Sequence, residues 1–394
     1  MRALRSGLLP VLAGILLIFS LAASACSAQV GRAPASGLET GPTQTSAPQA
    51  SGLAVTTIVS PTATLAPSPT TSLTSTASPA PTPAPVLRQL TSGGCCVGPF
   101  WSPDSQQVLY IDKPSQDAQA GIWGVGLQGG VPELFTDRLG LYSDDLSLLA
   151  YPQGGRSVVE RLADGTRWSI ANGGRPISFS PDDTQVAWTG GQSGPPYDTA
   201  RRQVWVSQVD GSQAHMVLEV FGGGFVSWLP DGRMLVDGRL DVSEPGEAFW
   251  IYDPQNPDPG AMRELARADR LRGVLLSPGG SWLAYQVAFA SDPAEDGLWL
   301  VNIESGKRTR MDLFGAYRWR DDNRLLVIPL DTSATWHSLW EFDALSGKLR
   351  ALTEPQVTPF KVADGDWSVS PDGRYIAFVS AQDFNIWLMT LPQN

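Results

Sequence analysis

Short apolar stretches alternate with turns rich in glycine, proline, serine and aspartate through most of this chain. Residues 366–394 show the pattern: a strand ends at Val369, Ser-Pro-Asp-Gly at 370–373 forms a tight turn, a second strand covers 375–379, and a third centres on Trp387. Proline presets the second position of such a turn, and glycine takes the positive φ that follows. Both faces of this small sheet are apolar, so both must be covered by neighbours.

Six earlier copies of this unit align on the turn, at intervals of 37 to 50 residues. The turn aspartate is expected to bond local backbone amides, and its position is held by Asp104, Asp145, Asp182, Asp231, Gly279, Asp322 and Asp372. Four residues further on, every copy has an aliphatic residue: Val108, Leu149, Val186, Leu235, Leu283, Leu326 and Ile376. Six residues on, six copies are apolar or aromatic and one has Asp237. This alternation predicts the register of the second strand.

The third strand carries a tryptophan in six copies: Trp123, Trp205, Trp250, Trp299, Trp340 and Trp387. We expect this row to pack between neighbouring sheets, where burial of each ring stabilises the fold by roughly 2 to 3 kcal/mol. The row therefore indicates core structure more than a binding surface.

A fourth strand follows in the earlier copies, for example at 349–353, but the last copy ends before it. Residues 86–91 resemble that missing strand. The sequence thus predicts an all-β fold over 86–394, a seven-bladed β-propeller closed by pairing of the N-terminal strand with the C-terminal blade.

The N-terminus has the pattern of an export signal. Arg2 and Arg5 precede an apolar run over 8–21 and then small residues, which predicts a signal peptide over 1–25. Cys26, directly after the small residues, resembles the lipidated cysteine of the lipobox of bacterial lipoproteins, although Ala23 stands where that motif usually has leucine. Residues 26–85 are rich in serine, threonine, proline and alanine, which predicts a disordered tether.

The turn motifs also carry a family resemblance. Trp-Ser-Pro-Asp at 101–104, Phe-Ser-Pro-Asp at 179–182 and Val-Ser-Pro-Asp-Gly at 369–373 resemble the WD40-like propeller repeat of TolB-type bacterial proteins. The resemblance implies a propeller of envelope proteins. It implies no activity, because such blades serve scaffolds, peptidase accessory domains and lipoproteins alike.

Charge and composition narrow the function classes. The formal net charge of −11 makes nucleic acid an improbable partner, because phosphate binding needs an excess of lysine and arginine. The chain has only His215 and His337, no HExxH or CxxC pair, and no complete G-x-S-x-G elbow. We therefore expect a non-catalytic protein without a cofactor, with calcium as the open alternative.

Two adjacent cysteines, Cys95 and Cys96, form the second unusual feature. Their Cα atoms would lie about 3.8 Å apart, below the usual disulfide range. A strained disulfide between neighbours and two reduced, partly buried thiols are both compatible with the sequence. Metal binding is a more distant alternative.

The links between second and third strands are long in five copies, at 113–120, 189–203, 238–248, 289–297 and 331–338. They should emerge together on one face, and long loops on a rigid ring commonly carry function. The candidate binding residues there are Tyr197, Asp198, Asp241, Glu244, Glu247, Asp292, Glu295, Asp296, Asp331 and Trp336. They suit a basic partner segment or a calcium ion, or they are simply solvated acidic loops. Asp237 is a further candidate.

These observations predict an exported, lipid-anchored monomer, located outside the cytoplasmic membrane or in the periplasm and attached only through its lipid. Its expected role is that of a protein-binding or scaffold module whose partner is an envelope protein or peptide. The alternatives are an enzyme or a small-ligand or metal-binding propeller that uses acidic residues near the central channel, and a module that binds glycans through exposed aromatic residues.

Overall fold

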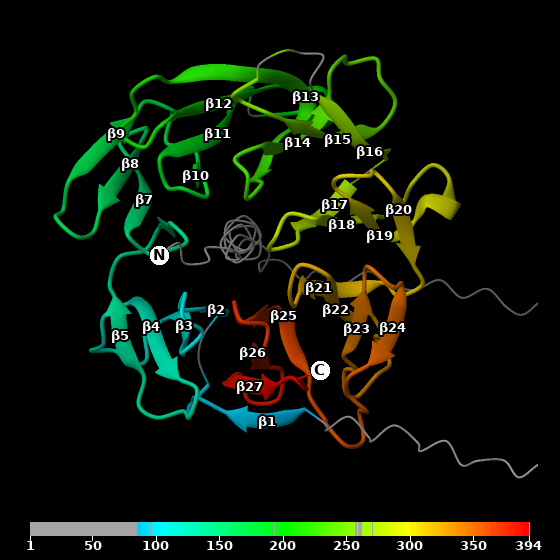
Figure 1. Ribbon diagram of the computed structural model, residues 1–394. Helices are drawn as coiled ribbons and strands as arrows, with labels where there is room; N and C mark the ends of the chain where they lie inside the picture. Colours follow the sequence, from blue (N-terminus) through cyan, green and yellow to red (C-terminus); the bar gives the residue numbers. More distant parts are fainter. Residues whose placement is uncertain are drawn as a thin grey trace, which may run out of the picture. The chain divides into compact units, whose positions relative to one another are not determined.

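The computed structural model describes residues 85–94, 97–192, 194–256, 258, 262–269 and 271–393. Over these residues the secondary structure is β-strand with short 3₁₀ helices, which confirms the predicted all-β class. Antiparallel sheets stand around a common centre, the arrangement of a β-propeller (Figure 1). In the sheet of β17 to β20, the first strand lies toward the centre and the last strand outside (Figure 1).

Five of the sheets have four strands each. The first two contain β2 (Val97–Trp101), β3 (Gln107–Asp112), β4 (Gly121–Gly126) and β5 (Glu133–Thr136), then β6 (Leu141–Tyr142), β7 (Leu148–Gln153), β8 (Arg156–Arg161) and β9 (Arg167–Ile170). The next two contain β17 (Leu271–Leu276), β18 (Trp282–Val287), β19 (Gly297–Asn302) and β20 (Arg308–Met311), then β21 (Gly315–Trp319), β22 (Arg324–Pro329), β23 (Trp340–Asp343) and β24 (Lys348–Ala351). The fifth contains β1 (Val86–Gln89), β27 (Ile386–Thr390), β26 (Tyr375–Ser380) and β25 (Val362–Val369).

The first described strand thus belongs to the same sheet as the last three. β1 runs antiparallel to β27, with Val86 opposite Thr390 and Gln89 opposite Trp387. Beyond the strand, the Ile386 N–H donates to Thr91 Oγ1 at 2.8 Å. The resemblance of 86–91 to a fourth strand corresponds to this pairing.

The predicted ring of seven four-stranded blades closed by that pairing is wrong. The described strands form five four-stranded blades and, in addition, one continuous sheet of seven strands. This larger sheet contains β10 (Ser178–Phe179), β11 (Gln185–Gly191), β12 (Arg201–Gln208), β13 (His215–Trp228), β14 (Met234–Arg239), β15 (Glu247–Tyr252) and β16 (Arg263–Ala268). Seven copies of the turn motif therefore do not correspond to seven separate sheets.

The physical reason lies in β13, which runs for 14 residues without a break. Its first part pairs with β12 and its second part with β14, and Phe221 is opposite both Arg201 and Arg239. The register with β14 shifts after Phe221, where Gly222, Gly223 and Gly224 all have positive φ. Glycine accepts this backbone conformation without steric cost. A strand that the repeat pattern divides into two is thus one strand shared by two repeats.

The turns between first and second strands form as the sequence predicts. In four of them a serine hydroxyl donates to the aspartate two residues on, at 2.6 to 2.8 Å, and the pairs are Ser102 with Asp104, Ser143 with Asp145, Ser180 with Asp182 and Ser370 with Asp372. The same carboxylates accept backbone amides, for example that of Gln106 at 3.0 Å. Asp322 is the exception, because Asp321 accepts the local amides of Asn323 and Arg324.

The predicted aliphatic column forms the centre of the core, with each member at most 3% exposed. Around it, buried side chains of neighbouring sheets pack together, as Phe249 and Tyr285 do with ring centroids 5.3 Å apart. The tryptophan row is less buried than expected. Only Trp250, at 7% exposed, is buried, and the other five are half-buried.

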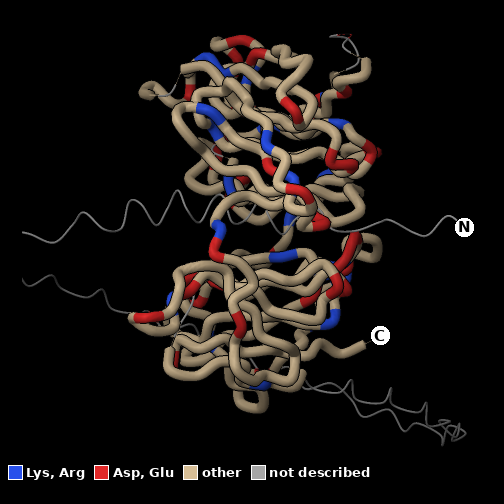
Figure 2. Tube along the Cα trace, turned by 90° about the vertical axis from the view of Figure 1, so that its left-hand side faces the viewer, with Lys and Arg blue, Asp and Glu red and all other residues tan. Residues whose placement is uncertain are grey.

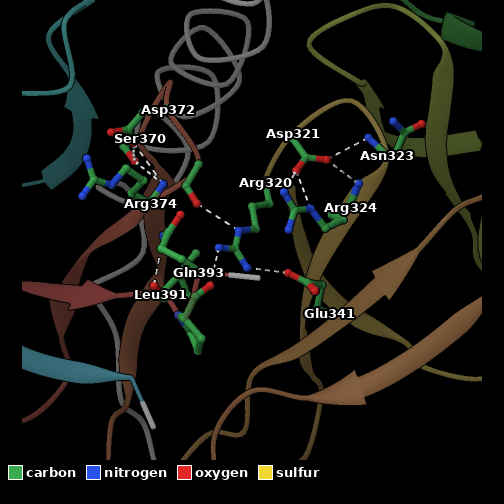
Figure 3. Close-up of polar contacts among 12 residues, drawn as sticks. Arg320, Asp321, Asn323, Arg324, Glu341, Ser370, Asp372, Arg374, Leu391 and Gln393 are labelled. Carbon is green, nitrogen blue, oxygen red and sulfur yellow. Dashed lines mark hydrogen bonds and ion pairs between the residues drawn. The ribbon is translucent and has the colours of Figure 1, made fainter. Parts of the chain in front are cut away.

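Acidic and basic positions are interspersed along the described chain (Figure 2). One arginine is nevertheless deeply buried: Arg320 donates to Glu341 at 2.7 Å, to Gly373 O at 2.9 Å and to Pro392 O at 2.6 Å (Figure 3). Glu341 also pairs with Arg350 at 2.5 Å. This network joins the sheet of β21 to β24 to the C-terminal sheet and segment.

Candidate functional site

One end of the sheets carries the links between second and third strands and the links from each fourth strand to the next sheet, because successive strands are antiparallel. We call this end the loop face. The long second-to-third links there are 113–120, 192–200, 240–246, 288–296 and 330–339, close to the predicted ranges. The opposite end carries the short serine-aspartate turns.

The tryptophan row holds these links in place, a role that the sequence pattern does not reveal. The indole N–H of Trp123 donates to Gln119 O at 3.2 Å, that of Trp299 to Glu295 O at 2.8 Å, and that of Trp387 to Asp383 at 3.2 Å. Each acceptor precedes its tryptophan by four residues. The rings are partly exposed because they lie at the rim of the sheet. There the apolar body of the indole packs against the sheet while its N–H reaches the polar backbone of the link.

Four of the eight predicted acidic residues shape their own loops. Asp241 accepts the N–H of Ser243 at 2.8 Å, Asp292 that of Ala294 at 2.9 Å, and Asp331 that of Ser333 at 2.9 Å. Asp296 accepts the Ala290 N–H at 2.8 Å. These carboxylates act as turn formers, which is the usual role of aspartate in loops.

Two of the predicted glutamates are paired with arginines. Glu244 lies 3.0 Å from Arg267, and Glu295 lies 3.4 Å from Arg308. Both arginines also stack on tryptophans of the row, with Arg308 4.4 Å from the Trp299 ring centroid and Arg267 5.7 Å from that of Trp250. Their charges are therefore largely satisfied within the protein.

The remaining predicted acids, Asp198 and Glu247, converge with Asp237 beside the glycines of β13. A Cβ at Gly222 would lie 2.9 Å from the backbone carbonyl oxygen of Asp198 and 3.2 Å from Glu247 Oε1, and one at Gly223 would clash with Asp237 Oδ1. Glycine is therefore needed at both positions for the Asp198 backbone and for the side chains of Glu247 and Asp237 to approach β13. We call this group of three the acidic cluster.

The electrostatics of the acidic cluster follow from its partial burial. Burial and the neighbouring Glu247 charge raise the pKa of Asp237 to about 7, although the Gly224 N–H bonds its carboxylate. Burial also raises the pKa of Glu247; Arg239 opposes this shift, while Asp198 and Asp269 add to it. Asp269 was not among the predicted site residues; it lies just beyond the end of β16, and only the fold brings it near Glu247.

Nine exposed apolar side chains of the described residues lie on links of the loop face. Phe289 is 75% exposed and Leu330 is 68% exposed. The set on this face consists of Leu139, Tyr197, Leu240, Val242, Phe289, Phe314, Leu330, Val357 and Phe384. Tyr197 is the predicted aromatic that is open to solvent, whereas Trp336 is half-buried. Asp237, the polar exception in the apolar column, lies in β14, two residues before the strand end that leads into the 240–246 link.

The two histidines do not form a catalytic pair in the described structure. His215 lies at the start of β13 and contacts Gln213 O at 2.8 Å through Nδ1. His337 lies in the 330–339 link, its ring packs edge-on against Phe360, and its Nδ1 accepts the Val362 N–H at 3.3 Å. Burial lowers the pKa of His337. Within the residues that the structure describes, no group of three or more histidine, cysteine or acidic side chains is arranged to hold a metal ion.

Several predicted features lie outside the described residues, namely Cys26, the signal peptide and tether, and the pair Cys95 and Cys96. Their roles stay predictions. The described ranges contain no helix with the length and apolar character needed to cross a membrane.

Comparison with known proteins identifies the fold. No protein-family model matches the sequence, and no curated protein matches it. Among solved structures, an oligogalacturonate lyase in complex with manganese is 16% identical with a TM-score of 0.53, covering 78% of this chain and 93% of that one. The oligogalacturonate lyase of Vibrio parahaemolyticus is 12% identical with a TM-score of 0.54, covering 78% and 94%. TolB from Acinetobacter baumannii is 13% identical with a TM-score of 0.38, covering 73% and 77%.

At these identities the likeness shows a β-propeller and nothing finer. Of the predicted resemblance to TolB-type proteins, the part that is shown is the β-propeller itself. The chain is an all-β propeller protein, and its function must be argued from its own surface.

Proposed function

We propose that this chain is an exported, lipid-anchored propeller that binds an envelope protein or peptide through its loop face and performs no chemistry itself. The observation that carries the proposal is that exposed large apolar side chains, such as Phe289 and Leu330, lie on links of that face. Large apolar residues in contact with solvent on neighbouring loops are typical of protein interaction sites. The signal pattern before Cys26 supports the location outside the cytoplasm.

The scaffold of these loops suits recognition. The indole bonds to Gln119, Glu295 and Asp383 hold three of the links, and the arginines over Trp250 and Trp299 fill the rim between strands. A surface held in one conformation loses little entropy when it binds, which favours affinity. The loop face therefore supplies preorganised apolar contacts.

The test is site-specific crosslinking in native cells. A photoreactive phenylalanine analogue is placed at Phe289 or Leu330 on the loop face, or at Leu345 in the turn between β23 and β24 at the opposite end, as the matched control with 73% exposure. We expect discrete crosslinked protein from the first two positions and none from Leu345. Equal crosslinking from Leu345, or no crosslink from either loop-face position, would contradict the proposal.

The alternative of an enzyme depends on Asp237. A carboxyl group whose pKa lies at about 7 can exchange a proton under physiological conditions. Because two of the similar folds are oligogalacturonate lyases, the direct measurement is release of unsaturated product from oligogalacturonate by the full chain, with and without manganese. Turnover that is lost in Asp237→Asn would favour this alternative over a binding role.

A further inference from the structure

We propose that one part of the loop face, around Tyr197 and the acidic cluster, binds a partner segment that carries a lysine or arginine beside apolar residues. The inference rests on the proposed function and specifies the chemistry of the partner. It follows from exposed apolar side chains and from a local excess of negative charge at the same place.

The apolar part of this area comes from two neighbouring links. Tyr197 is 64% exposed, Val242 49% and Leu240 37%. The two links are tied together because Arg239, next to Leu240, donates to the Asp198 backbone carbonyl. Burying such side chains against a partner removes apolar surface from water, which favours binding of a segment that also carries apolar residues.

The carboxylates beside it outnumber the arginine that acts on them. Among the described residues, no ion pair within 4 Å involves Asp198 or Glu247. The other arginines nearby are engaged elsewhere: Arg201 lies 3.4 Å from Glu219, Arg267 pairs with Glu244 and Glu264, and Arg202 donates to Gln192 O. Arg239 is the cation that acts on Glu247, against the charges of Asp198 and Asp269.

A partner cation would complement this charge. A lysine or arginine needs only one or two carboxylate acceptors, which the cluster offers at the border of the apolar side chains. Complementary charges of this kind set the specificity and the salt dependence of association. The occupant is therefore a cationic, partly apolar segment rather than an acidic or wholly apolar one.

The experiment uses the full chain as bait for short random peptides displayed on phage. We expect the selected sequences to combine lysine or arginine with apolar residues. A synthetic selected peptide should bind the Asp198→Asn/Glu247→Gln variant about tenfold more weakly than wild type, a loss expected for complementary charges at an interface. The matched control, Asp292→Asn/Asp331→Asn, removes the same charge from other parts of the loop face and should change binding much less.

The outcomes separate the two proposals. Selected peptides without basic residues, or peptides that bind both double variants as tightly as wild type, overturn the cationic segment while the loop-face function stands on its crosslinking test. Binding that needs calcium ions and is independent of peptide charge also overturns it. Failure of the crosslinking test overturns both. Unfolding midpoints of the two variants, measured alongside, show that a loss of binding is not a loss of folding.

Discussion

The carboxylate of Asp322 accepts a hydrogen bond from the Ser277 hydroxyl at 2.5 Å, across the boundary between two sheets. Ser277 belongs to the turn in which Gly279 replaces the usual aspartate. Asp322 also accepts the Gly279 N–H at 2.9 Å and the Ser281 hydroxyl at 2.5 Å. The following turn thus supplies the carboxylate that this turn lacks.

This relationship predicts a rescue experiment. Asp322→Ala should lower the free energy of unfolding by about 2 to 3 kcal/mol, because it leaves several donors of the Ser277 turn without an acceptor. Gly279→Asp should also destabilise, because its Cβ would lie 2.6 Å from the Asp322 carboxylate carbon.

The double variant Gly279→Asp/Asp322→Ala returns the carboxylate to its usual place and should recover most of the loss. Urea unfolding of the single and double variants measures this coupling. Additive losses in the double variant would show that the two positions do not substitute for one another.

The raised pKa of Asp237 predicts a pH dependence of stability. Its pKa is 3.8 ordinarily and about 7 in the fold, so the folded protein holds the proton more tightly. The wild type therefore loses stability from this group as the pH rises from about 4 to about 7. Asp237→Asn removes that loss and should be more stable than wild type at neutral pH, by on the order of 2 kcal/mol, with little difference near pH 4.

Thermal or urea unfolding across this pH range is the measurement for Asp237. Asp117→Asn, a substitution of an exposed aspartate on another loop, is the control and should follow the wild-type profile. Parallel profiles for Asp237→Asn and wild type would contradict the raised pKa of Asp237 in the folded protein.

The Arg320 network predicts a large stability effect. The side chains of Arg320 and Glu341 are only 2% and 4% exposed (Figure 3). Removing one partner of a buried pair leaves the other charge without compensation, so Glu341→Gln should cost about 3 kcal/mol or more.

The exposed pair of Arg161 and Asp164 is the control for the buried one, with side chains 48% and 50% exposed. Asp164→Asn should leave the free energy of unfolding unchanged within error, since water screens such pairs. A similar small change for both substitutions would mean that the Arg320 network contributes no net stability.

The N-terminal prediction is tested by location. Cys26→Ser should abolish incorporation of labelled fatty acid and release the protein from the membrane fraction, because the lipid is the expected attachment. A substitution in the tether, Ser27→Ala, is the control and should leave both unchanged. Membrane association of Cys26→Ser equal to wild type would reject the lipid anchor.

Much of the loop face could be predicted, because long links between regular strands are visible in the sequence. Glu247 and Asp198 were identifiable as candidates in this way. The sequence could not show that Asp198 and Glu247 differ in role from Asp241, Asp292 and Asp331. It does not reveal which carboxylates accept hydrogen bonds from the amides of their own loop. Asp269 gave no signal, since it follows β16 and approaches Glu247 only through the fold.

By itself the sequence determined the class of structure: alternation of apolar residues defines the strands, and the serine-aspartate turns define where they reverse. These are local effects of side-chain direction and turn chemistry. Tertiary structure decided how repeats join. Whether Phe221 ends one sheet or bonds two neighbours depends on the partners on both sides of β13, and whether Asp322 serves its own turn or that of Ser277 depends on the distance between two sheets. The sequence of a single repeat encodes neither the partners of β13 nor the distance between the two sheets.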